Sequence, residues 1–328
     1  MPTRRHVLAL GAAAALVPHR ASAQPTWAPT RNVIVVVPYP AGGNVDVLAR
    51  IVAREIAPGL GQSVIVENQA GASGAIGARR VARAEPDGHT LILTTNQTHA
   101  TNVALLPDGG GYDPVRDFTP LAGIADLQHL LVVRPGLGPK SVAELLALAR
   151  STERGLTCAS TGIGSASHLA MELFKAKTRV ALVHVAYRGA APLLQDLVGG
   201  RVDLSFVTTP TVLGQVTGGQ LEALAVASPT GSPQLPALPT LAAAGVPGVE
   251  ADAWTGLFGP AGMPAGVRDR YAGLVAEALA RPAVREAIAA QGMNLNPRGP
   301  DAFAAFQRDE VVRWAAIIRE AGVQPEKP

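Results

Sequence analysis

The first constraint on the fold is a run of five β-branched residues, Val33–Val37, that ends at Pro38. An uninterrupted apolar run of this length is typical of a strand buried on both faces of a parallel sheet. Two adjacent glycines, Gly42 and Gly43, follow in a loop, and apolar residues then recur at helical spacing across Val45–Ile56. The order of strand, glycine loop and helix therefore predicts an α/β fold.

The same order is repeated further along the chain. Val64–Val66 is predicted as a short strand, Gly71–Gly74 as a loop, Ala75–Ala84 as a helix and Leu91–Thr94 as a third strand. Strands that alternate with helices are typical of a doubly wound sheet, in which ligands lie beyond the carboxyl ends of the strands. Both glycine loops are expected at those ends.

A second doubly wound lobe is expected from Leu130 onward. A capping box at Ser141–Glu144 opens its first helix. The Pro-, Gly- and Ser-rich segment Ser228–Pro247 is predicted to be a surface connection or hinge, and Trp254–Phe258 then returns to the first lobe. The strands of the second lobe are predicted at Leu130–Val133, Leu156–Ala159, Val183–Tyr187, Val202–Val207 and Glu222–Ala227.

The N-terminus has the pattern of a cleaved export signal, residues 1–23. Arg4 and Arg5 precede an apolar run, Val7–Val17, that is too short to span a bilayer and is followed by the small residues Ala21–Ala23. This leader is compatible with either the twin-arginine or the general secretory route. It predicts a periplasmic protein.

Chain length favours two domains. The roughly 300 residues that remain after the leader exceed the usual size of one domain. We expect one lobe to comprise residues 24–127 and 251–328, and the other to comprise residues 128–250, with a hinge between them.

Charge and cysteine content exclude several classes of function. The chain has 28 Lys+Arg and 25 Asp+Glu residues, and three of the basic residues lie in the leader, so the mature chain has no net formal charge. It has no Lys/Arg stripe of the kind that binds nucleic acid. The single cysteine, Cys158, cannot form an intramolecular disulfide, and His89 and His99 are isolated from other metal-ligating residue types. We expect no nucleic-acid partner, no metal and no cofactor.

The first glycine loop is a candidate anion site. It contains Ala41, Gly42, Gly43 and Asn44, and Asp46 lies in the first turn of the predicted helix. Unpaired backbone N–H groups and the helix dipole favour an anion at such a helix start. The alternative is a tight turn in which Asn44 or Asp46 caps the helix. The loop lacks the features of a Walker loop and of a dinucleotide-binding motif.

The second glycine loop, with Gly71, Ser73 and Gly74, offers the same geometry at the next strand end. Two neighbouring loops that present N–H donors without a cation suit a carboxylate better than a phosphate. The alternative is that both loops are ordinary turns.

In the second lobe, a polar stretch follows a predicted strand and opens a helix. Its residues Ser160, Gly164, Ser165 and His168 could surround an anion, or Ser165 could cap the helix beside a structural His168. A hydrolase that uses Ser165 with His168 and Asp203 is a further alternative, although helical spacing alone does not activate a serine.

Tyr187, Arg188 and Gly189 end another predicted strand. Arg188 either pairs with a ligand carboxylate or is a solvated surface charge. Asp203 lies on the polar side of its predicted strand, where it could take a ligand ammonium or hydroxyl group or cap a neighbouring loop.

With these loops, the chain resembles the substrate-binding proteins of tripartite tricarboxylate transporters, the Bug-type receptors. The resemblance implies a type II periplasmic-binding fold, with two lobes and a deep cleft in which backbone amides and hydroxyls hold ligand carboxylates. The stretches that carry it run in order along nearly the whole mature chain: Val37–Asp46, Val66–Asn68, Gly71–Gly77, Glu85–Gly88, Tyr112–Phe118, Ser160–His168, Tyr187–Gly189 and Gly199–Asp203.

The resemblance also implies the site. Ala41–Asn44 and Gly71–Gly74 would form the wall of the first lobe, with Thr95 and Asn96 beside them. The residues that would face them from the second lobe are Ser160, Ser165, His168, Tyr187–Gly189 and Asp203.

The chain departs from the family pattern at Ala70, Ser73 and Asn102–Leu106. These departures affect how the last segment packs over the pocket and which ligand Ser73 admits.

The function implied by the resemblance is that of a solute-binding protein and not of an enzyme. It would capture a small carboxylate and deliver it to integral membrane transporter subunits. A receptor that presents its ligand to a sensor system is the alternative. We expect a monomer that closes around its ligand by hinge motion.

Overall fold

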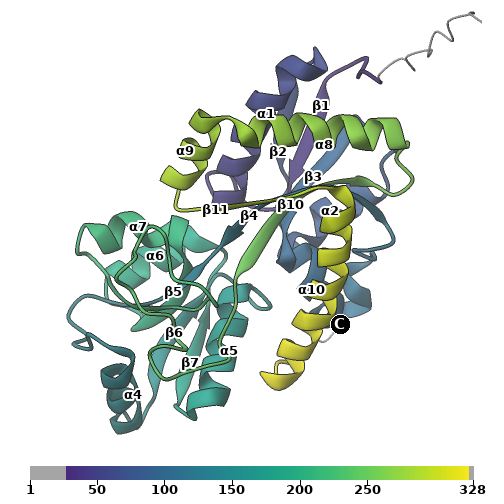
Figure 1. Cartoon of the computed structure of the whole chain (residues 1–328). Coiled ribbons are helices and arrows are strands. Elements are labelled where there is room, and N and C mark those ends of the chain that lie inside the picture. Colours follow the sequence, from purple (N-terminus) through teal and green to yellow (C-terminus); the bar gives the residue numbers. More distant parts are fainter. Residues whose placement is uncertain (1–26, 325–328) are drawn as a thin grey trace, which may run out of the picture.

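The computed structural model describes residues 27–324 and contains two β-sheets with flanking helices, arranged as two lobes (Figure 1). The predicted leader lies outside the described residues. Within the described residues, no helix is long and apolar enough to cross a membrane. The two-lobed α/β fold expected from the sequence is confirmed.

The sheet of the first lobe has six strands. β1 lies between β2 and β3 and pairs with both in parallel, as the valine run predicts, whereas β10 pairs antiparallel with β3 and β4. The sheet is therefore mixed. Its strand order is β11 (Asn294–Arg298), β4 (Phe118–Leu127), β10 (Ala253–Pro260), β3 (Thr90–Thr95), β1 (Val33–Val37) and β2 (Val64–Asn68).

The helices of the first lobe come from both ends of the chain. α1 buries Leu48, Val52 and Ile56, the apolar positions that predicted it. Short helical turns lie at Ala72–Gly74, Gln97–Thr101 and Pro107–Gly110. The α-helices are α1 (Asn44–Leu60), α2 (Ala75–Ala82), α3 (Asn102–Leu105), α8 (Ala265–Ala280), α9 (Pro282–Ala290) and α10 (Pro300–Glu320).

The sheet of the second lobe has five strands. β6 pairs in parallel with β7 and β8, and β5 pairs antiparallel with β8 and β9. The strand order is β7 (Leu182–Ala186), β6 (Leu156–Ser160), β8 (Leu204–Thr208), β5 (His129–Val133) and β9 (Glu222–Val226). The helices are α4 (Val142–Ser151), α5 (Ala166–Thr178), α6 (Ala190–Val198) and α7 (Thr209–Thr217).

The predicted capping box begins α4. Oγ of Ser141 accepts a hydrogen bond from the backbone N–H of Glu144 at 3.2 Å, and Oε2 of Glu144 accepts one from the backbone N–H of Lys140 at 2.7 Å. The first bond satisfies a donor that a helix start would otherwise leave unpaired, whereas in the second Glu144 reaches the residue before the N-cap and not the N-cap itself. Sequence and structure agree on this helix start.

Two segments of the chain pass between the sheets. β4 leads into β5 through Gln128, and the chain returns from β9 to β10 after the long connection that contains Ser228–Pro247. The lobes also contact each other through α10 and α5, where Lys177 pairs with Glu320. One apolar cluster, which includes Trp254, extends through both lobes. Movement of one lobe relative to the other must therefore bend the two crossing segments.

Candidate functional site

The two glycine loops of the first lobe lie side by side at the carboxyl ends of β1 and β2. A Cβ atom at Gly74 would lie 3.3 Å from Cβ of Pro38, at the end of β1, and would overlap Cγ2 of Thr98. The φ of Gly74 is +85°, a conformation that other residues rarely adopt. The second loop therefore needs a glycine here to pack against the first.

Asp46 holds the first loop in shape. Its Oδ2 accepts a hydrogen bond from the backbone N–H of Gly42 at 2.9 Å, and its Oδ1 accepts one from Nδ2 of Asn68 at 2.9 Å. Arg50 pairs with the same carboxylate at 3.0 Å. Burial alone would raise the pKa of Asp46, but the bonds from Arg50, Gly42 and Asn68 lower it below its ordinary value. Asp46 therefore stabilises the loop. The N–H of Gly42 is hydrogen-bonded to Asp46 and is not available to a ligand. Ala41, Gly42 and Gly43 remain exposed.

The second glycine loop is held by Asn102, which belongs to the segment Asn102–Leu106 that departs from the family pattern. Nδ2 of Asn102 donates to the backbone carbonyl of Ser73 at 3.0 Å and to the hydroxyl of Tyr112 at 3.1 Å. The hydroxyl of Tyr112 donates to the carbonyl of Thr98 at 2.6 Å. Gly71 is exposed and Ser73 half-buried. The backbone of this loop is therefore held by Asn102 while part of the loop remains accessible to solvent.

Thr95 and Asn96 lie at the end of β3, beside the two loops. Oγ1 of Thr95 lies 2.8 Å from the hydroxyl of Tyr39, which belongs to the first loop. Asn96 is 1% exposed, and its Nδ2 has no hydrogen-bond partner in the part of the chain that the structure describes. A buried donor without a partner is uncommon in folded proteins. Asn96 is thus a donor that a ligand or a water molecule could satisfy.

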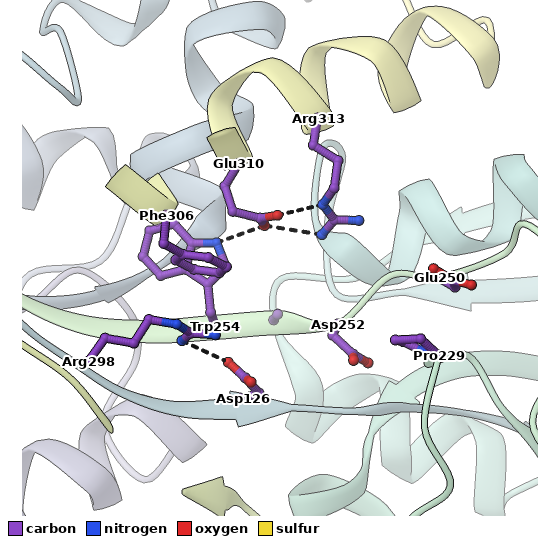
Figure 2. A pocket seen from close by; sticks show the side chains of 10 residues that line it. Asp126, Pro229, Glu250, Asp252, Trp254, Arg298, Phe306, Glu310 and Arg313 are labelled. Atoms are coloured by element: carbon purple, nitrogen blue, oxygen red, sulfur yellow. Dashed lines mark hydrogen bonds and ion pairs between the residues drawn. The ribbon is translucent and has the colours of Figure 1, made fainter. Parts of the chain in front are cut away.

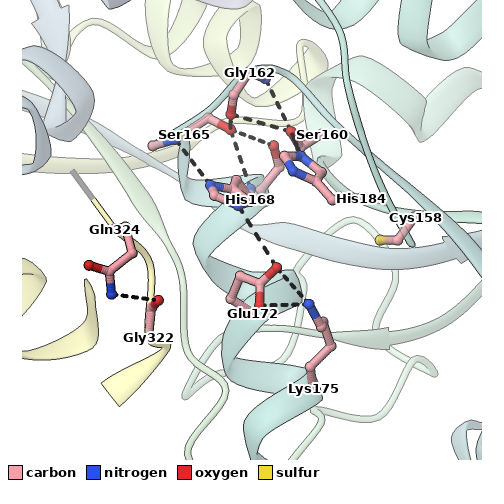
Figure 3. A network of polar contacts seen from close by, with 12 residues as sticks. Cys158, Ser160, Gly162, Ser165, His168, Glu172, Lys175, His184, Gly322 and Gln324 are labelled. Atoms are coloured by element: carbon pink, nitrogen blue, oxygen red, sulfur yellow. Dashed lines mark hydrogen bonds and ion pairs between the residues drawn. The ribbon is translucent and has the colours of Figure 1, made fainter. Parts of the chain in front are cut away.

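The corresponding loop of the second lobe begins α5. Ser165 is the N-cap: its Oγ accepts from the backbone N–H of His168 at 3.3 Å and donates to the carbonyl of Gly162 at 2.7 Å. Nδ1 of His168 accepts from the backbone N–H of Gly164 at 3.1 Å. Oγ of Ser160 lies 2.6 Å from Nε2 of His184 (Figure 3). These side chains fix the loop from within.

Two stacked histidine rings support this loop. The ring centroids of His168 and His184 are 4.2 Å apart, with an angle of 10° between the planes (Figure 3). Burial, the neighbouring His184 and Lys175 lower the pKa of His168 to about 4. His168 is therefore neutral near pH 7, and its unprotonated Nδ1 can accept the Gly164 N–H.

Tyr187, Arg188 and Gly189 follow β7 next to this loop. The backbone N–H of Tyr187 donates to the carbonyl of Ser160 at 2.9 Å, and its hydroxyl donates to Oδ2 of Asp196 at 2.8 Å. Arg188 is exposed and makes no ion pair or side-chain hydrogen bond to any described residue. It is a cation that is free to bind an anion at the carboxyl end of β7.

The loops of the two lobes meet. Nδ2 of Asn44 donates to Oγ1 of Thr208 at 2.8 Å and to Oγ1 of Thr211 at 3.1 Å. Oγ1 of Thr101 donates to the carbonyl of Gly164 at 3.1 Å. Turns from opposite lobes therefore converge, as a site between the lobes requires.

Comparison with known families agrees with this arrangement. The sequence profile of the family described as "Tripartite tricarboxylate transporter family receptor" matches residues 48–323. The chain belongs to this family. It is a periplasmic-type solute-binding receptor, the class that the sequence resemblance predicted.

Several relatives of this receptor match its chain over nearly their whole length. Protein BugT of Bordetella pertussis is 36% identical over 297 residues, which cover 90% of this chain and 91% of BugT. The structure of an R. palustris protein with adipate is 37% identical, with a TM-score of 0.86, and the match covers 91% of this chain and 99% of that one. The periplasmic binding protein BugD is 35% identical, with a TM-score of 0.83, covering 91% of this chain and all of the other. A malate-bound protein from Rhodopseudomonas palustris is 35% identical, with a TM-score of 0.81, covering 88% and 99%.

In this receptor, Asp203 lies away from the converging loops. It precedes β8 at the strand's N-terminal end. Its Oδ1 accepts from Nε of Arg134 at 2.9 Å, and its Oδ2 accepts from the backbone N–H of Thr157 at 2.9 Å. Ser160 lies at the opposite, carboxyl end of the same parallel pair of strands. The expectation of a ligand contact at Asp203 is corrected here, because the carboxylate ties two strand starts together.

The same positions bear on the hydrolase alternative. Oγ of Ser165 bonds to backbone groups and to Oγ of Ser167 but not to the ring of His168, and Asp203 is at the other end of the sheet. The three residues do not form a catalytic triad. Within the described residues, no group of three or more His, Cys, Asp or Glu side chains could hold a metal ion.

Sequence reasoning missed Thr208, Thr211 and Thr101 of this receptor. Thr208 ends β8 and Thr211 lies in the first turn of α7, which has Pro210 near its start. A polar Thr-Thr-Pro-Thr stretch after a strand was a usable signal for a loop at the site.

Proposed function

We propose that this protein binds a small dicarboxylate between its lobes and delivers it to integral membrane subunits of a tripartite tricarboxylate transporter. Membership of the receptor family supports the binding role. The observation that carries the proposal is the hydrogen bond between Asn44 and Thr208, because it brings the glycine loops of one lobe against the loops of the other.

Donors from both lobes suit a carboxylate at this junction. Asn96 contributes a buried Nδ2 with no partner among the described residues. The N-termini of α2 and α5 contribute the positive ends of two helix dipoles beside Gly74 and Ser165. Oriented donors at helix starts stabilise a carboxylate without a bound cation.

Arg188 favours a ligand with a second carboxylate. It lies in the second lobe, next to the loop that contains Ser160, and has no acidic partner within the described residues. The solved relatives named for adipate and malate carry dicarboxylates. For this chain we infer the same class of ligand, with one carboxylate at the glycine loops and the other toward Arg188.

We expect binding in the micromolar range, where a Kd of about 1 μM corresponds to a free energy of about −8 kcal/mol.

Delivery would depend on lobe closure. We propose that the described residues of the ranges 24–127 and 251–328 form one rigid lobe, that residues 128–250 form the other, and that a monomer exported by its leader presents the closed form to the membrane subunits. The candidate contacts in the first lobe are Ala41, Gly43, Asn44, Gly71, Ser73, Gly74, Thr95 and Asn96, and those in the second are Ser160, Gly164, Ser165, Arg188 and Gly189.

Calorimetry of the mature protein tests the binding role. Malate and adipate, matched monocarboxylates, tricarboxylates and amino acids form the panel, and small-angle scattering with and without the best ligand measures closure. Binding of at least one dicarboxylate at micromolar Kd with a smaller radius of gyration is expected. The absence of heat with every acid contradicts the proposal. Purification with or without the membrane subunits then separates a transport receptor from a sensor receptor.

A further inference from the structure

A cavity lies at the two segments that pass between the lobes, away from the converging loops. It has a volume of about 280 Å³. Asp126, next to last in β4, and Asp252, just before β10, both line it (Figure 2). The other lining residues are Pro229, Glu250, Ala253, Trp254, Arg298, Phe306, Glu310 and Arg313.

The two aspartates differ in their partners. Oδ2 of Asp126 accepts from Nδ2 of Asn296 at 2.5 Å, and Nη1 of Arg298 lies 3.6 Å from its Oδ1. Asp252 accepts one hydrogen bond, from Oγ of Ser228 at 2.6 Å. Its Oδ1, like Oδ1 of Asp126, is buried without a hydrogen-bond partner among the described residues, but no described arginine pairs with Asp252 as Arg298 does with Asp126. A charged carboxylate at this position therefore lacks a bonded cation.

The cations near the cavity are bound to other groups. The guanidinium of Arg298 pairs with Asp126 and lies 3.8 Å from the ring centroid of Phe306. Arg313 pairs with Glu310 in α10. Neither arginine is bonded to Asp252.

The remaining groups around Asp252 are acidic or neutral. Glu310 also accepts from Nε1 of Trp254 at 2.9 Å, and exposed Glu250 lies two residues before Asp252. His129, at the start of β5, is neutral because burial lowers its pKa to about 4. Asp252 thus faces carboxylates from neighbouring elements with little positive charge to balance its own.

These surroundings favour the protonated acid. Burial raises the pKa of Asp252 to about 7; the hydrogen bond from Ser228 and the charge of Arg313 oppose this shift, and Asp126 and Glu250 add to it. The direction agrees with the geometry, in which one buried carboxyl oxygen is left without a donor.

We propose that Asp252 is a proton-dependent switch of the hinge, whose protonated form favours the present arrangement of the lobes and whose ionised form favours an arrangement that exposes it to water. Asp252 lies between Ser228, which follows a strand of the second lobe, and Asp126, which is next to last in a strand of the first. Hinge rotation must therefore change its solvation. The inference rests on the proposed function only for the existence of hinge motion.

The size of the effect follows from proton linkage. An ordinary, water-exposed aspartate is ionised throughout the range above about pH 5. In the present arrangement Asp252 carries a proton that it lacks in the open form. The population of the present arrangement relative to the open form therefore falls by up to about tenfold between about pH 6 and about pH 8. Closure is favoured on the acid side.

Distances between spin labels on the mature protein without ligand test this switch. Ala147→Cys on α4 and Glu286→Cys on α9 place one label on each lobe at exposed positions, and Cys158 is buried and does not compete for the label. The wild type is expected to shift toward longer distances from about pH 6 to about pH 8. Asp252→Asn is expected to keep the short distances over the whole range.

Two further variants sharpen the result. Glu250→Gln removes an exposed carboxylate that lines the same cavity and is expected to retain the pH response. Ser228→Ala removes the one hydrogen bond to the carboxylate and is expected to move the midpoint to higher pH. Distances that do not change with pH, or an unchanged response in Asp252→Asn, overturn the switch. A decrease in the distance between the labels when ligand is added to the same samples tests the hinge motion separately.

Discussion

Nδ2 of Asn44 lies 2.8 Å from Oγ1 of Thr208, although the two residues are 164 positions apart in the sequence. Asn44 is the first residue of α1 in one lobe, and Thr208 is the last residue of β8 in the other. With the second bond to Thr211 at 3.1 Å, this contact links the lobes directly at the glycine loop. The bond is between protein groups, so it stabilises closure in addition to any ligand.

The first prediction concerns this contact. Asn44→Ala is expected to weaken ligand binding up to about thirtyfold, because two neutral hydrogen bonds contribute about 1 kcal/mol each to the closed form. Calorimetry gives the affinity, and small-angle scattering shows whether the ligand-bound variant is more open. Asn32→Ala, at an exposed asparagine before β1, serves as the control. Unchanged affinity in Asn44→Ala would mean that the contact does not contribute to closure.

The second prediction concerns Gly164. A Cβ atom there would lie 2.7 Å from Cδ1 of Leu105 in the other lobe, and the φ of Gly164 is +73°. Gly164→Ala is therefore expected to weaken binding, chiefly through faster ligand dissociation, which stopped-flow fluorescence measures. Gly219→Ala is the matched control, since its φ is +70° and nothing lies within 4 Å.

A double variant separates the two causes in Gly164→Ala. If contact with Leu105 is responsible, Leu105→Ala is expected to restore part of the affinity when it is combined with Gly164→Ala. If backbone strain alone is responsible, the loss stays the same in the Leu105→Ala background.

Local patterns account for the parts of the fold that sequence reasoning predicted. The run Val33–Val37 is β1 itself, and Ser141–Glu144 opens α4 as a capping box. Each of these signals is complete within a few consecutive residues. Strand, turn and helix-cap preferences act over that range.

The roles of individual site residues could not be read in the same way. Asp46 braces its loop through Asn68, which is 22 positions away. Asp203 lies at a strand start, and its place was predicted from alternation, which gives a face of the sheet, although the carboxyl end of a parallel strand is the ligand end. Thr208 contacts Asn44 only because two lobes meet. Pairings that depend on tertiary contact leave no local pattern.

The third prediction concerns ligand class. Arg188→Ala is expected to weaken binding of a dicarboxylate about tenfold and to have little effect on the monocarboxylate of the same length, because only the former supplies a second anion. Calorimetry with both acids measures the difference. Arg150→Ala, at an exposed arginine on α4, controls for a general loss of positive charge. Equal losses for both acids would place Arg188 away from the second carboxylate.

The fourth prediction concerns the pH dependence of folding. The pKa of His168 is about 4 in the folded protein, below its ordinary value. Between about pH 4 and the ordinary histidine pKa of about 6.5, the unfolded chain binds a proton that the folded chain does not. Stability contributed by neutral His168 is therefore present above about pH 6.5 and is lost as the pH falls toward 4.

His168→Gln tests this dependence, since Gln can accept the Gly164 N–H but cannot titrate. The free energy of unfolding, measured with denaturant at several pH values in this range, is expected to rise less steeply with pH than in the wild type. The difference in slope is up to about 1.4 kcal/mol per pH unit. Gln195→Ala, at an exposed site on α6, is expected to keep the wild-type slope. If His168→Gln kept it too, the ring would be protonated in the folded protein, and its Nδ1 could not be the acceptor that holds Gly164 in place.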